Sequence, residues 1–261
     1  MRIKANGIAI NYRIDGPEGA PWIVFSNSLA TSLAMWDEQA AALQNSYRVL
    51  RYDQRGHGDT DAPAGRYAFD TLLADALALI DALGIEKTHF AGLSMGGATA
   101  LGLVERHPER FDRVIVCDSP CRSTEQSSQQ WEERIATAQK QGIAALVEPT
   151  IARWFAPETV AANPPHLDKV RAMIRSTPVD GFIGCAAALA DHDYASAVAG
   201  VKRPVLFVAG EKDGAAPAAM RKLHEKLNGS RFVELAGAGH ISNMDRPAEF
   251  NRAVGDFLTA G

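Results

Sequence analysis

A serine set between closely spaced glycines is the strongest candidate for chemistry in this sequence. The segment GLSMG at 92–96 matches the pattern G-x-S-x-G, in which a sharp turn from strand to helix presents a serine hydroxyl, here that of Ser94. The alternatives are a phosphate-binding loop and an ordinary turn. A phosphate loop needs Gly-Lys-Ser/Thr and a dinucleotide loop needs a further glycine, and the segment has neither. We therefore predict that Ser94 is a nucleophile.

A serine hydroxyl is a weak nucleophile and needs a base within hydrogen-bond reach. Two histidines lie on glycine-flanked loops that follow predicted strands, His240 in GAGH and His57 in RGHG. Hydrolases with this type of turn place serine, acid and histidine in that order along the chain, and only His240 leaves room for an acid after Ser94. We predict His240 as the base. His89 is expected inside a strand, and the others are expected at the surface: His107, His166, His192 and His224.

The acid of such a site orients the imidazole and stabilises its charged form. Asp213, in GEKD, follows the predicted strand PVLFVA and should reach the same sheet edge as His240. Asp118, which ends the strand RVIVC, is the rival, and Glu211 is the third choice. Asp213 is favoured because a glycine lies three residues before it and a proline four residues after it.

Two backbone N–H groups aimed at the developing alkoxide would complete the site as an oxyanion hole. One should belong to Met95, the residue after the nucleophile. The other is expected from Leu29, in the loop SNSLA at 26–30 that follows the strand PWIVF. Both roles use the main chain, so the identity of either side chain carries little information.

Short apolar runs alternate with helical patterns in the segments that must position these residues. The pattern predicts helices at 70–83, 95–107, 217–227 and 247–258, the first capped by Asp70 and ended by Gly84. A hairpin turning at Asn6-Gly7 is predicted for 4–14, and further strands for 21–26, 47–52, 88–93, 113–117, 204–209 and 231–235. Strands that alternate with helices of this length indicate an α/β fold with a mostly parallel sheet.

The segment after Ser119 has a different character. Residues 123–190 contain several helical stretches divided by glycine and proline, and no candidate strand. The strand pattern returns at about residue 204. The sequence therefore predicts a core formed by residues 1–120 and 191–261, with a helical cap inserted at 121–190.

Composition excludes several classes of protein. The 261 residues are 46% hydrophobic and 22% charged, which is typical of a globular chain. The net charge of −4 and the lack of a basic run argue against nucleic acid or a membrane surface as partner. The first residues lack the apolar core of a signal peptide, so we expect a cytoplasmic protein. Cys117 and Cys121 are expected as buried free thiols, because no cysteine has the spacing of a zinc site.

Taken together, these motifs resemble those of the α/β-hydrolase superfamily over essentially the whole chain: SNSLA at 26–30, YDQRGHG at 52–58, GLSMGG at 92–97, GEKD at 210–213 and GAGH at 237–240. A narrower resemblance, to 3-oxoadipate enol-lactonases, rests on SNSL with MWD at 35–37 and on cap motifs. The cap motifs are Trp131 with RI at 134–135, IARWF at 151–155, GCAA at 184–187 and DHDY at 191–194. Departures from that family are Ala30, Thr60, Ala190 and His192.

The resemblance implies an α/β-hydrolase fold with an inserted helical cap and no cofactor or metal. It implies a small lactone substrate with a carboxymethyl arm, opened to 3-oxoadipate through an acyl-enzyme. Trp131, Arg134 and Trp154 are then the expected substrate-binding residues, with Arg153 as second choice for the carboxylate. The same triad also fits a carboxylesterase, a haloperoxidase-like hydrolase or a carbon–carbon bond hydrolase. A small-molecule receptor with slow turnover is the alternative outside enzymes.

Overall fold

The computed structural model describes residues 1–198 and 200–260, so residues 199 and 261 of the predicted core lie outside the described residues. Eight strands form one sheet in the order β1-β2-β4-β3-β5-β6-β7-β8. The pairs β1–β2 and β2–β4 are antiparallel, and all later pairs are parallel. Their bounds are Arg2–Ala5, Ile8–Asp15, Trp22–Ser26, Arg48–Tyr52, Thr88–Leu93, Phe111–Cys117, Val205–Gly210 and Arg231–Leu235.

Local sequence accounts for these strands. Every residue of β7 is buried, as expected of a parallel strand that is covered on both faces and reads as a continuous apolar run. The predicted hairpin is confirmed as β1 and β2, joined by a turn in which Asn6 and Gly7 have φ of 45° and 78°. Positive φ at both central residues is the turn geometry that suits the right-handed twist of paired strands.

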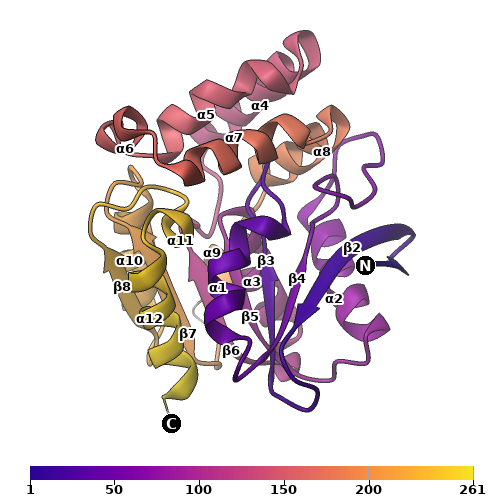
Figure 1. Ribbon diagram of the computed structural model, residues 1–261, viewed down its shortest axis with the longest axis vertical. Helices are drawn as coiled ribbons and strands as arrows, with labels where there is room; N and C mark the ends of the chain where they lie inside the picture. Colours follow the sequence, from indigo (N-terminus) through magenta and orange to yellow (C-terminus); the bar gives the residue numbers. More distant parts are fainter. Residues whose placement is uncertain (199, 261) are drawn as a thin grey trace.

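Helices cover both faces of the sheet. Figure 1 shows α1 (Asp37–Leu43) and α12 (Pro247–Thr259) side by side in front of it, with α2 (Phe69–Ala82) and α3 (Met95–Arg106) behind. The remaining core helices are α9 (Ala195–Val198), α10 (Ala216–Lys226) and α11 (Ser242–Asp245). Figure 1 also places the two chain ends on the same half of the molecule, away from the upper helices.

The prediction that Asp70 caps α2 is wrong. The cap position is held by Ala68, and Asp70 lies within the first turn, where its carboxylate pairs with Arg106 at 2.7 Å. An acidic side chain is favoured there because the first turn carries the positive end of the helix dipole. The predicted end of the helix is confirmed, since Gly84 follows it with a φ of 68°.

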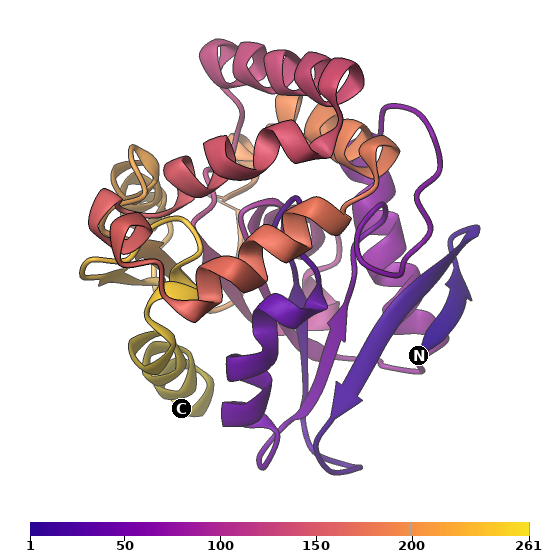
Figure 2. The ribbon, with the colours of Figure 1, turned by 45° about the horizontal axis from the view of Figure 1, so that its top comes forward.

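The helices between residues 125 and 190 lie above the sheet in Figures 1 and 2. They are α4 (Glu125–Gln141), α5 (Val147–Trp154), α6 (Pro157–Ala162), α7 (Pro165–Ser176) and α8 (Val179–Ala190). The first begins at a reciprocal capping arrangement of Thr124 and Ser127, which satisfies two free N–H groups. We propose that these helices form the cap, and that the sheet with its flanking helices forms the core.

Two smaller observations concern the same described residues. No helix within 1–198 and 200–260 is long and apolar enough to span a membrane.

Cys117, Cys121 and Cys185 are buried and free, which confirms the expectation for the first two. Burial raises the pKa of the Cys185 thiol, so that thiol is held in its neutral form.

Candidate active site

Ser94 lies at the turn between β5 and α3 in a strained backbone conformation. Its φ is 55° and its ψ is −112°, a combination outside the left-handed helical region that residues other than glycine rarely adopt. The flanking glycines allow the turn because a side chain would have no room. A Cβ at Gly92 would collide with the backbone of Gly96, and a Cβ at Gly96 would collide with the carbonyl of Ser26. The local sequence therefore dictates the shape of this turn.

The loops after β7 and β8 bring Asp213 and His240 together. Nδ1 of His240 donates to Oδ2 of Asp213 at 2.8 Å, and the two side chains are only 16% and 13% exposed. The loops approach so closely that a Cβ at Gly210 would collide with the carbonyl of Gly239. This hydrogen bond fixes the imidazole tautomer with the proton on Nδ1, which leaves Nε2 free to accept a proton.

A cavity of about 180 Å³ connects the predicted site residues of the sheet with those of the cap. Ser94, Leu29 and His240 line it from the ends of strands. The cap residues that line it from above include Trp131, Arg134, Arg153 and Trp154. The structure therefore brings together the predicted nucleophile, base and one oxyanion donor with all three predicted substrate-binding residues. Arg153, the second choice for the carboxylate, lines the same cavity.

Trp154 connects the cap to the predicted base. Its ring stacks on that of His240 with centroids 5.7 Å apart and an interplanar angle of 28°. Its carbonyl accepts the backbone N–H of His240 at 2.6 Å. Sequence reasoning predicted Trp154 only as a pocket residue and missed this contact, because α5 and the loop after β8 are far apart in the chain.

The predicted oxyanion donors lie where backbone N–H groups remain available. Leu29 and Met95 are buried. Neither N–H has an acceptor within the part of the chain that the structure describes. Met95 begins α3, whose first N–H groups point away from the helix and carry its positive dipole end.

The rival histidine bonds the predicted oxyanion loop and does not line the cavity that contains Ser94. His57 is fully buried; its Nε2 accepts the N–H of Ala30 at 2.8 Å, and its Nδ1 donates to the carbonyl of Arg55 at 3.0 Å. Ala30, which follows the predicted donor Leu29, has a φ of 57°. Burial lowers the pKa of His57 to about 4, so the ring is neutral and acts as a fixed acceptor.

The rival acids have other partners. The carboxylate of Asp118 accepts from the N–H of Gly210 at 2.7 Å and from the hydroxyl of Ser242. Burial, and then the charge of Asp213, raises its pKa well above the usual range. Glu211 accepts from the N–H of Gly237 at 2.8 Å and is exposed. Of the three candidates, Asp213 alone bonds His240.

The surface position predicted for His192 is wrong. His192 is only 7% exposed, because the loop after β6 and the end of α8 enclose it; its Nδ1 lies 2.8 Å from the carbonyl of Leu189. His166 is partly buried, with Nε2 3.7 Å from the carboxylate of Asp245. Among the described residues, no group of three or more histidine, cysteine or acidic side chains is arranged to hold a metal.

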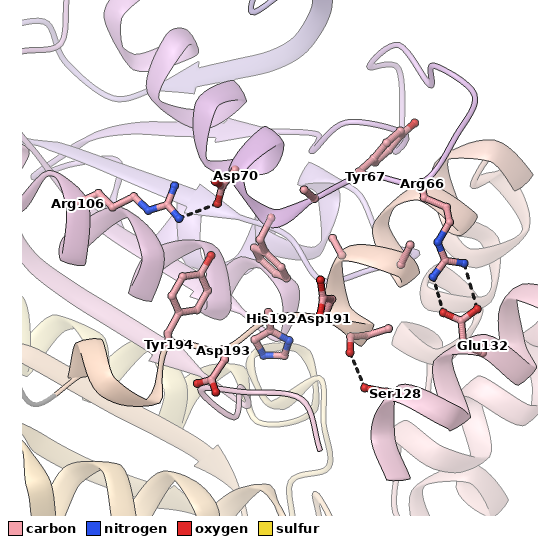
Figure 3. A pocket seen from close by; sticks show the side chains of 15 residues that line it. Arg66, Tyr67, Asp70, Arg106, Ser128, Glu132, Asp191, His192, Asp193 and Tyr194 are labelled. Atoms are coloured by element: carbon pink, nitrogen blue, oxygen red, sulfur yellow. Dashed lines mark hydrogen bonds and ion pairs between the residues drawn. The ribbon is translucent and has the colours of Figure 1, made fainter. Parts of the chain in front are cut away.

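A larger groove of about 680 Å³ lies on the other side of His192, which lines both spaces. Figure 3 shows that its arginines are occupied: Arg66 pairs with Glu132 of α4, and Arg106 pairs with Asp70 at 2.7 Å. This groove contains neither Ser94 nor His240. Both of its arginines are paired, and Asp191 and Asp193 add further negative charge, whereas the cavity above Ser94 is lined by arginines.

A family model described as alpha/beta hydrolase fold matches residues 21–247. The chain is a member of the α/β-hydrolase family. The match confirms both the superfamily and the fold class predicted from the motifs.

Relatives of this α/β-hydrolase extend over nearly its full length. A 3-oxoadipate enol-lactonase of Acinetobacter baylyi is 36% identical over 97% of this chain and 94% of its own. The crystal structure of an enol-lactonase from Burkholderia xenovorans LB400 is 40% identical, covers both chains completely and has a TM-score of 0.96. A relative from Pseudomonas savastanoi pv. phaseolicola carries the name of a carbamate hydrolase and is 29% identical over 92% of this chain and 95% of its own.

Because His57 is neutral in the folded chain, we expect the stability of this α/β-hydrolase to depend on pH. Its pKa is about 4 in the folded chain against an ordinary 6.5, so only the unfolded chain binds a proton between those values. The contribution of His57 to the free energy of unfolding is complete above pH 6.5 and is lost as the pH falls toward 4. We expect the free energy of unfolding to decrease by about 3 kcal/mol from this group between about pH 7 and pH 4.

Urea unfolding of the wild type and of His57→Gln at both pH values measures this effect. The glutamine carbonyl can still accept the N–H of Ala30 but does not titrate. The variant should therefore lose less stability than the wild type on acidification. An equal loss in both proteins would assign the acid sensitivity to other groups.

Proposed function

We propose that this protein hydrolyses a small lactone that carries a carboxylate arm, 3-oxoadipate enol-lactone, to 3-oxoadipate through an acyl-enzyme on Ser94. The observation that carries the proposal is a pair of arginines, Arg134 and Arg153, that line the cavity above Ser94 and form no ion pair within the described residues. The similarity to enol-lactonases over the whole chain supports the same substrate.

In the proposed mechanism, Nε2 of His240 removes the proton of Ser94 as its oxygen attacks the lactone carbonyl. The N–H groups of Leu29 and Met95 stabilise the oxyanion. The ring C–O bond then breaks, and His240 returns the proton to the departing enol oxygen. The enol becomes a ketone, which makes the ring opening effectively irreversible. Water, activated by His240, attacks the acyl group and releases the second carboxylate, while Asp213 stabilises the imidazolium at each stage.

Two cationic side chains flank Trp131 at the top of this cavity. The guanidinium carbons of Arg134 and Arg153 lie 4.8 Å and 5.5 Å from its ring centroid. Neither arginine forms an ion pair with a carboxylate in the described part of the chain.

Burial lowers the pKa of Arg134 to about 10, and burial together with the charge of Arg134 lowers the pKa of Arg153 to about 9. Both groups therefore remain protonated at neutral pH. Neither cation is ion-paired within the described residues, and only the more distant charge of Asp213 favours the protonated form of Arg153. Two neighbouring, partly desolvated cations of this kind favour an anionic ligand.

Direct assay tests the proposal. The purified protein is given the enol-lactone, simple aryl and alkyl esters, uncharged lactones and a carbamate, and kcat/KM is measured for each. The proposal requires the carboxylate-bearing lactone to be the best substrate, with many turnovers per protein molecule. A higher value for an uncharged ester would favour a carboxylesterase. A single burst with no further turnover would favour a receptor.

Replacement of Arg134 by alanine should penalise the charged substrate selectively. A hydrogen bond to a charged group contributes about 1.5 to 3 kcal/mol, so kcat/KM for the lactone should fall by about ten- to 150-fold. Hydrolysis of a neutral aryl acetate should change only a few-fold, because Ser94 and His240 are untouched. Arg134→Lys should recover part of the loss.

The matched variants are Arg153→Ala, which removes the other cavity arginine, and Arg175→Ala, which removes an exposed arginine of α7. We expect a selective loss for the first and no change for the second. Equal losses on both substrates for Arg134→Ala would indicate a collapsed cap, since an arginine stem also packs. No loss on either would remove Arg134 from the binding site.

A further inference from the structure

Asp118 is a fully buried carboxylic acid that takes no part in the proposed mechanism. It directly follows β6, and its φ of 47° lies in the left-handed region, which aspartate tolerates better than most residues. The pairing of β6 with β7 ends at Cys117 and Val208, and the N–H of Asp118 donates to the carbonyl of Val208 at 2.9 Å. Beyond this point the backbone of β6 turns away from its neighbour.

Beyond the end of the pairing, the carboxylate of Asp118 provides the hydrogen-bond acceptor that β6 no longer provides to β7. Gly210, two residues further along β7, donates its N–H to Oδ1 of Asp118 at 2.7 Å. That N–H would otherwise be buried without a partner, which costs free energy comparable to a lost hydrogen bond. Oδ2 accepts from the hydroxyl of Ser242, which is also fully buried. One side chain therefore satisfies two groups that belong to different loops.

Both loops carry a residue of the proposed triad. Gly210 begins the turn to Asp213, whose N–H donates back to the carbonyl of Gly210 at 3.0 Å. Ser242 begins α11, two residues after His240. The loops themselves are joined by the N–H of Lys212, which donates to the carbonyl of Ala238 at 2.8 Å. Asp118 adds a further connection from the end of β6, the strand that lies between β5, which leads to Ser94, and β7, which leads to Asp213.

We propose that Asp118 is a positioning residue that holds the loops of Asp213 and His240 in register, and so maintains the hydrogen bond between their side chains. The proposal rests on the proposed triad but not on the identity of the substrate. It does not require a charge on Asp118. A neutral amide of the same shape can accept from Gly210 through its oxygen and donate to the hydroxyl oxygen of Ser242 through its nitrogen, and it loses only the weaker contact with the backbone N–H of Ser242.

Asn and Ala variants at position 118 separate positioning from charge. Asp118→Asn keeps both connections and should lower kcat on an aryl acetate only a few-fold. Asp118→Ala breaks both and should lower kcat by about 100-fold, the scale of a displacement of about 1 Å in a catalytic group. KM should change little, because no residue that lines the cavity is replaced.

The second readout is the proton NMR resonance of Nδ1–H of His240, which lies far downfield because the proton is shared with a carboxylate. His240→Gln assigns the resonance by removing it. Asp118→Ala should shift or broaden it, and Asp118→Asn should preserve it. The matched control is Val114→Ala, which removes buried methyl groups from the same strand away from the loops. It should lower the melting temperature and leave both the resonance and kcat on the aryl acetate unchanged.

Ser242→Ala keeps the test decisive if Asp118→Ala does not fold. It removes the hydroxyl hydrogen bond to the loop of His240 and leaves the backbone N–H of Ser242 beside the carboxylate, so it should alter the resonance and lower kcat by less than Asp118→Ala does. Wild-type resonance and kcat in a folded Asp118→Ala or in Ser242→Ala would overturn the proposal. The same changes in Val114→Ala would also overturn it, since they would follow from lost stability alone. If the lactone is not the substrate, the proposed function fails but these aryl acetate results are unaffected. If Ser94 is not the nucleophile, the proposed triad fails, and Ser94→Ala then retains aryl acetate activity.

Discussion

Ser94→Ala is expected to lower kcat by about a millionfold while the protein stays folded. Removal of the nucleophile from a Ser-His-Asp unit leaves only the contributions of the oxyanion hole and substrate binding. The backbone turn should survive, because the close approach of Gly92 and Gly96 does not depend on the serine hydroxyl. The measurement is steady-state kcat on the lactone and on an aryl acetate, with circular dichroism to verify the fold.

Ser119→Ala is the matched control, since this serine borders the same cavity and, within the described residues, its hydroxyl donates only at 3.3 Å to the carbonyl of Pro120. It should retain activity within a few-fold. Mass spectrometry of wild type quenched during aryl acetate turnover should find the acetyl group on the peptide that contains Ser94. Near-wild-type turnover by folded Ser94→Ala would contradict the mechanism.

Asp213→Asn is expected to lower kcat by about ten-thousandfold. An amide cannot accept the Nδ1 proton of His240 through its nitrogen or stabilise the imidazolium, so the base is left in the wrong tautomer. The 2.8 Å hydrogen bond is the contact that the substitution removes. The effect is read from kcat on the aryl acetate across a range of pH.

Asp118→Asn provides the comparison, because Asp118 is the acid at the end of the neighbouring strand and bonds Gly210 and Ser242 instead. The decrease in kcat caused by Asp118→Asn should be more than a hundredfold smaller than that caused by Asp213→Asn. If Asp118→Asn were the more damaging of the two, the catalytic acid would have to be assigned to the end of β6.

Local features of this chain could be predicted from its sequence. The turn at Ser94 follows from glycines at 92 and 96, whose hydrogen side chains alone fit the space available. The buried strands follow from continuous apolar runs, and the end of α2 follows from Gly84. The start of α2 was misassigned because Asp70 suits both the cap and the first turn, and its tertiary contact with Arg106 decides between them.

The choice of His240 and Asp213 could also be made from the sequence, because it depends on topology. Residues that follow parallel strands gather at one edge of the sheet, and the order of serine, acid and histidine restricts the candidates. The structure then places the two side chains in hydrogen-bond contact.

Contacts between distant elements were decided only by the tertiary structure. The neutral state of His57 and the enclosure of His192 depend on burial by segments far away in the chain. Arg134 and Arg153 belong to different helices, and they meet on Trp131 because α4 and α5 pack above the sheet. Periodicity and spacing describe one element at a time, whereas burial and unpaired charge depend on the packing of several elements together.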